Sequence, residues 1–110
     1  MTFKSGDGTP HQTPESLLTL AEYLELSLDL GGSLIMMRPR FQACAMYVKI
    51  PAGPKEDLRS CGMIEEVLAD EILQLTHVGI NHLEIDGQAY RFVRSFAHIA
   101  RHGAVVFAPV

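Results

Sequence analysis

The dipeptide Asp86-Gly87 constrains the fold of this chain more than any other feature. It separates His82–Ile85 from Tyr90–Val93, two segments rich in residues that favour strands. Asp-Gly readily adopts the positive φ angles of a two-residue turn whose twist matches the strands beside it. We therefore expect an antiparallel hairpin here. His102-Gly103 predicts a second turn, which leads into the apolar run of residues 104–107.

Two earlier segments also predict strands. Residues 41–50 contain valine, tyrosine and isoleucine, and the turn-forming cluster of residues 51–54 follows them. Residues 33–37 form a shorter candidate that Pro39 is expected to interrupt, because proline cannot donate a ladder hydrogen bond.

The first predicted helix begins at Thr13-Pro14-Glu15. A hydroxyl N-cap, a proline at the first helical position and an acid near the positive end of the dipole are typical of a helix start. We place this helix at residues 14–23, because residues 24–30 alternate leucine with polar residues in the manner of a strand. A helix that continues to residue 30 is the alternative. Gly31-Gly32 ends either version, as a hairpin turn or as a helix stop.

A second helix is expected at residues 55–77. Pro54 suits its first turn, and Gly79 is a plausible stop. Gly62 costs about 1 kcal/mol relative to alanine inside a helix, so a later start near that residue is the alternative. The buried stripe of this helix is expected to consist of Ile64, Val67, Leu68, Ile72 and Leu75.

Helix, strands, helix and further strands is the order of an α+β domain. We predict an antiparallel sheet of about five strands packed against two helices, at residues 14–23 and 55–77, which cover one of its faces. The length of 110 residues suits one hydrophobic core. We expect residues 13–110 to form this single domain, after a flexible N-terminal tail of residues 1–12.

The composition narrows the class of protein. A hydrophobic fraction of 47% and a net charge of −4 do not fit a disordered chain. No apolar run approaches the roughly 20 residues of a membrane span, and residues 1–8 do not resemble a signal peptide. Cys44 and Cys61 are too few for a disulfide scaffold. We expect a cytoplasmic protein with reduced thiols and no membrane association.

The charges are unevenly distributed along the chain. Residues 1–86 carry six Lys/Arg and all thirteen Asp/Glu, whereas residues 87–110 carry Arg91, Arg94 and Arg101 with no acid. Three arginines do not make the dense basic footprint of a nucleic-acid-binding protein. We therefore expect that the protein binds no nucleic acid. The arginines are instead candidates to neutralise acids of the second helix, within one chain or across a dimer. Those acids are Glu65, Glu66, Asp70 and Glu71.

One segment, Tyr90–His102, predicts a ligand site. Read as a strand, it places five side chains on one face, namely Tyr90, Phe92, Arg94, Phe96 and His98. An arginine and a histidine among aromatic rings are costly to bury unpaired, which favours a pocket for a small polar or anionic ligand. A β-bulge near Arg94 that returns both groups to solvent is one alternative. A short helix over residues 95–102, capped by Ser95, is another.

The cysteines and histidines predict no cofactor or metal. Cys44 alternates with Met46 in a strand and is expected in the core, and Cys61 is expected to be structural too. His98 and His102 would make half of a zinc site on a helix. On a strand they would lie about 13 Å apart, too far for one ion.

The sequence contains none of the nucleophile-elbow, P-loop or dinucleotide-binding motifs that would indicate an enzyme class. We therefore expect a non-catalytic binding or interaction module that forms a homodimer. The apolar last strand, residues 104–108, would pair or pack at an edge of the sheet. The alternative is a small hydrolase, isomerase or lyase. In that enzyme Arg94 would bind an anionic group and His98 would act as general acid or base.

Overall fold

The computed structural model describes residues 13–40, 42–52, 55–99 and 101–110, so the predicted tail lies outside the described residues. Two helices and six strands follow one another along the chain, and the predicted α+β class is confirmed. The elements are α1 (Glu15–Leu30), β1 (Ser33–Arg40), β2 (Ala43–Ala52), β3 (Lys55–Glu65), α2 (Glu66–Leu75), β4 (Gly79–Ile85), β5 (Gln88–Ile99) and β6 (His102–Pro109).

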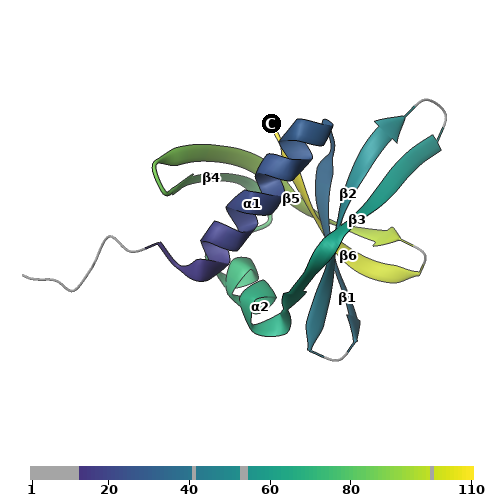
Figure 1. The fold of residues 1–110 in the computed structure, drawn as a ribbon, viewed down its shortest axis with the longest axis horizontal. Coiled ribbons are helices and arrows are strands. Elements are labelled where there is room, and N and C mark those ends of the chain that lie inside the picture. The colour runs from purple at the N-terminus through teal and green to yellow at the C-terminus, as the bar shows by residue number, and fades with distance from the viewer. Residues whose placement is uncertain (1–12, 41, 53–54, 100) are drawn as a thin grey trace, which may run out of the picture.

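The six strands form one antiparallel sheet in the order β3-β2-β1-β6-β5-β4. Two three-stranded meanders, β1–β3 and β4–β6, join where β1 pairs with β6 (Figure 1). Leu34 lies opposite Phe107, and Met37 lies opposite Ala104. The apolar last strand is therefore central, with β1 on one side and β5 on the other. The prediction that it supplies an edge is wrong, since β3 and β4 are the edges of this sheet.

The first helix is longer than predicted, and the proposed strand at residues 24–30 is wrong. Its buried side is Ser16, Leu20, Leu24 and Ser27, which is a helical stripe that begins and ends in serine. The Ser27 hydroxyl donates to the Leu24 carbonyl at 2.8 Å, which makes its burial tolerable. The helix ends at Gly31, in the left-handed conformation, where Gly32 N–H bonds to Ser27 O. The helix-stop alternative for Gly31-Gly32 is confirmed.

The predicted second helix was placed too early. Residues 55–65 form strand β3, and α2 begins at Glu66, near the later start that Gly62 suggested. Residues 57–60 are exposed, as suits a polar edge strand. Gly62 has φ of 145°, and a Cβ there would lie 2.6 Å from the Tyr23 hydroxyl of α1. A glycine at this position thus leaves room for the Tyr23 side chain.

The predicted turns differ in how well they match. Asp86 and Gly87 have φ of 52° and 82°, so the hairpin between β4 and β5 is confirmed. The second turn was predicted at His102-Gly103, but it lies before these residues, because β6 already begins at His102. The strand reading of the segment after residue 94 is confirmed as far as Ile99, and the helical alternative is wrong. Pro39 does not end β1, although the pairing with β2 shifts between Met37 and Arg40.

The main core lies between the sheet and the two helices, which cover the same face (Figure 1). Phe92 and Phe107 are fully buried there, with ring centroids 5.7 Å apart. The other buried members are Leu20, Leu24, Leu34, Met36, Cys44, Met46, Ile64, Ala69 and Ile72. In the described part of the chain, we call the opposite face of the sheet the helix-free face. No helix among the described residues is long and apolar enough to cross a membrane.

Candidate functional site

Strand β5 presents the five predicted site residues in one row, as the strand period requires. The structure divides that row into two parts. Tyr90 and Phe92 lie under the helices, where Phe92 is fully buried and the Tyr90 hydroxyl donates to the Glu25 carboxylate of α1 at 2.6 Å. Phe96 and His98 extend past the helices into an exposed region. Arg94 lies at the boundary.

Arg94 is held by the C-terminal end of α2. Its Nη1 donates to the Leu73 carbonyl at 3.0 Å and to the Thr76 hydroxyl oxygen at 2.7 Å. The last carbonyls of a helix lack intrahelical donors and carry partial negative charge, so a guanidinium is stabilising there. Over Gln88–Ile99, β5 pairs with β4 and β6 without a register shift, so the bulge alternative is wrong. The charge is accommodated by a helix end instead.

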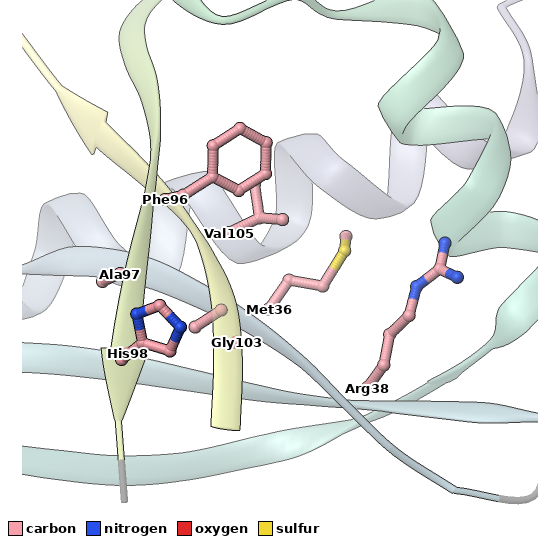
Figure 2. A pocket seen from close by; sticks show the side chains of 8 residues that line it. Met36, Arg38, Phe96, Ala97, His98, Gly103 and Val105 are labelled. Carbon is pink, nitrogen blue, oxygen red and sulfur yellow. The ribbon is translucent and has the colours of Figure 1, made fainter. Parts of the chain in front are cut away.

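A pocket of about 330 Å³ lies beside the exposed part of the row. Met36, Phe96 and Val105 give it an apolar lining, and Gly103 leaves space in its wall. Arg38 and His98 lie at opposite sides of it (Figure 2). Arg94 is not among the residues that line this pocket. The predicted row therefore supplies two of the lining side chains and not the cation.

The acidic side of α2 is partly neutralised by Arg38, which extends from β1. Its guanidinium bonds to the Asp70 carboxylate and lies 3.7 Å from a carboxylate oxygen of Glu66. These three side chains are each close to half exposed, so the ion pairs contribute little stability, about 0–1 kcal/mol each. The expectation that a C-terminal arginine neutralises these two acids within the chain is wrong. Arg94 bonds to the helix end instead, and Arg91 is exposed on the helix-free face.

The helix-free face carries apolar rows that cross the middle of the sheet. The register aligns Tyr47, Ile35, Val106 and Ser95 in one row across four strands. The adjacent row consists of Ala45, Met37, Ala104 and Ala97. A sheet that faces water on one side normally alternates apolar with polar residues, whereas strands that are apolar on both faces are typical of sheets covered on both sides.

The rim of this face is mixed, because exposed apolar Ile80 on β4 and Met63 on β3 lie there among polar residues. His82 and Glu84 lie on edge strand β4, and Arg91 lies opposite His82 on β5. Glu65 lies at the other edge, on β3.

The thiols and imidazoles do not converge. Cys44 is buried in the core, and burial raises the pKa of its thiol, which favours the neutral form. His98 and His102 point to opposite faces of the β5–β6 hairpin, because His98 pairs with Gly103 and His102 pairs with Ile99. Among the described residues, no group of three His, Cys, Asp or Glu side chains is arranged to hold a metal ion.

No protein-family model, curated protein or solved structure that was compared with this chain matches it. The site is therefore interpreted from its own geometry. Sequence reasoning missed Arg38, Met36 and Gly103, because they come from β1 and β6 and only the strand order brings them beside β5. The alternation of β1 placed Met36 and Arg38 on one face, but nothing local indicated which strand lay next to it.

Proposed function

We propose that this chain is a non-catalytic binding module that forms a homodimer through its helix-free face and holds a small ligand beside Phe96 and His98. The observation that carries the proposal is the exposure of large apolar side chains on the helix-free face, where Met63 on β3 is 61% exposed and Ile80 on β4 is 50% exposed. Ile35, at the centre of the same face, is fully buried within the single chain, so a partner would contact mainly the apolar side chains around it.

The size of the face suits a second copy. Six strands about 4.8 Å apart, over about eight residues at about 3.3 Å each, give a face of at most roughly 600 Å². Two such faces would bury no more than about 1,200 Å² in total, since Ile35 and Ala104 are already buried in the single chain, and this limit lies at the lower end of the range for specific interfaces. Twisted sheets pack face to face about 10 Å apart with interdigitated side chains, which the mixture of alanine and larger residues here allows. A twofold dimer uses the same patch on both copies.

The alternative of a small enzyme has weaker support. It needs Arg94 and His98 in one pocket, where the arginine would bind an anionic group. The guanidinium of Arg94 instead bonds to α2, and the pocket that His98 lines does not include it. The geometry therefore favours a binding role.

Charge-introducing variants at two exposed positions test the homodimer. Ile80 and Met63 lie on the helix-free face and are 50% and 61% exposed, so Ile80→Lys and Met63→Lys should fold normally. Together they should abolish dimerisation at micromolar concentration in sedimentation velocity, because an interface would bury the added charges. Val78→Lys is the matched control, since Val78 is 57% exposed and precedes β4. Equal sedimentation of the double variant, the control and the parent chain would refute the proposal.

A further inference from the structure

We propose that the pocket beside Phe96 and His98 binds an uncharged aromatic molecule of about two fused rings. This inference rests on the proposed binding role, and it is independent of self-association through the helix-free face. It replaces the polar or anionic ligand expected from the sequence, because the cation that the expectation relied on, Arg94, is bonded to α2.

The lining sets the size and the chemistry of the ligand. Met36 is 2% exposed at the floor of the pocket, whereas Phe96 is 67% exposed and offers an aromatic ring. A ring from the ligand would stack on Phe96 or meet it edge to face. Benzene fills an apolar cavity of about 150 Å³, so a pocket of about 330 Å³ suits a molecule roughly twice that size. Pockets of this volume are at the lower end of the range that holds small molecules.

The charges beside the pocket disfavour an anionic ligand. Arg38 is bonded to Asp70 and lies against Glu66, so the three groups together carry one negative charge. A ligand carboxylate that approached Arg38 would also approach two carboxylates, so the net charge of this group disfavours an anion. An uncharged oxygen avoids this repulsion. The guanidinium has five N–H donors, which leaves donors for a hydroxyl or carbonyl group.

Gly103 keeps part of the pocket open. It lies on the pocket side of β6, opposite His98, and a Cβ built there would have nothing within 4 Å. Its φ angle is not in the left-handed range, so a larger residue fits the backbone. Gly103→Val should therefore fill the pocket without strain. Valine is also a better strand former than glycine.

The test compares two probes of the same shape and different charge. β-Naphthol is neutral and β-naphthoate is an anion at neutral pH, and the backbone amide shifts of the full chain report where each binds. We expect β-naphthol to bind about tenfold more tightly or better, with the largest shifts at residues 36, 96–98 and 103–105. Its affinity should not change between about 0.05 and 0.5 M NaCl, since no ion pair forms.

Variants locate the binding. Gly103→Val and Phe96→Ala should each weaken β-naphthol binding by about tenfold or more, and Val78→Ala, another exposed apolar truncation, should leave it unchanged. Tighter binding of β-naphthoate, or equal binding to Gly103→Val, would overturn the inference.

Sedimentation of the same samples separates this inference from the homodimer. A monomeric chain that binds β-naphthol in this pocket keeps the ligand site and loses self-association. A homodimer that Phe96→Ala dissociates, and that β-naphthol does not bind, means that a second copy occupies the pocket, and the ligand inference is then wrong.

Discussion

Arg94 Nη1 donates a hydrogen bond to the carbonyl oxygen of Leu73 at 3.0 Å, so a side chain of β5 holds the C-terminal end of α2. The same nitrogen donates to the hydroxyl of Thr76, which in turn donates to Ile72 O. The last turn of α2 contains no basic residue of its own. The positive charge that stabilises a helix end is therefore supplied by Arg94, which lies 21 residues after Leu73 in sequence.

Replacement of this guanidinium tests its structural role. Arg94→Met keeps most of the apolar stem and should lower the free energy of unfolding by about 1.5–3 kcal/mol, as for a hydrogen bond to a charged group. Arg91→Met, on the opposite face of the same strand and exposed, should change it by no more than about 0.5 kcal/mol. Urea denaturation measures both. Equal small effects would mean that the Arg94 bonds do not stabilise α2.

The Tyr23 side chain of α1 fits against β3 because residue 62 is glycine. Gly62→Ala forces a Cβ to within 2.6 Å of the Tyr23 hydroxyl, at a φ of 145°. It should cost about 1–3 kcal/mol in unfolding free energy. Gly103→Ala is the control, because space is open there and φ is ordinary, and it should be neutral or slightly stabilising. Tyr23→Phe should restore part of the stability lost in Gly62→Ala, and no recovery would show that backbone strain accounts for the whole loss.

The Tyr90 hydroxyl makes stability depend on pH in the alkaline range. Burial, and then the hydrogen bond to the Glu25 carboxylate, raises the pKa of Tyr90 to about 12. The unfolded value is about 10, so the folded state holds this proton more tightly. The associated stabilisation is fully present below about pH 10 and is lost as the pH rises to about 12. Tyr90→Phe should flatten the pH dependence of the urea midpoint in that window. An unchanged slope would contradict the assignment.

Asn81 closes the connection between α2 and β4. It is 2% exposed, accepts a hydrogen bond from His77 N, and donates to the carbonyls of His77 and Gly79. Asn81→Ala leaves these backbone groups without their side-chain partner and should cost about 1–3 kcal/mol. The neighbouring His82→Ala, exposed on the helix-free face, should be close to neutral in the same thermal unfolding experiment. A neutral Asn81→Ala would show that water replaces the amide.

Local patterns predicted the elements whose signals are local. The Asp86-Gly87 hairpin and the strand period of β5 depend only on adjacent residues, and both are confirmed. The predicted end of α1 was wrong because serines, Ser16 and Ser27, occupy part of its buried stripe. The leucines of residues 24–30 alternate with polar residues as in a strand, and one of them, Leu28, is 52% exposed on the helix. The start of α2 was wrong because β3 is polar along an edge, a pattern that also fits a solvated helix.

The candidate site was predicted only in part, for a different reason. The row on β5 followed from its period, but the environment of each member depends on neighbours that are distant in sequence. Arg94 meets α2, Tyr90 meets α1, and Phe96 meets Val105 in β6. The pocket is lined by residues of β1, β5 and β6, so it forms only because β6 lies between β1 and β5. No short segment of the sequence specifies that strand order.

The mass of the chain in solution distinguishes the proposed homodimer from a monomer. Sedimentation equilibrium over a range of micromolar concentrations should give a mass that approaches 2 × 12.1 kDa, or about 24 kDa, as the concentration rises. This homodimer is expected because Met63 and Ile80 are exposed apolar side chains on the face that the two described helices leave uncovered. A mass that stays at 12.1 kDa at every concentration would contradict it.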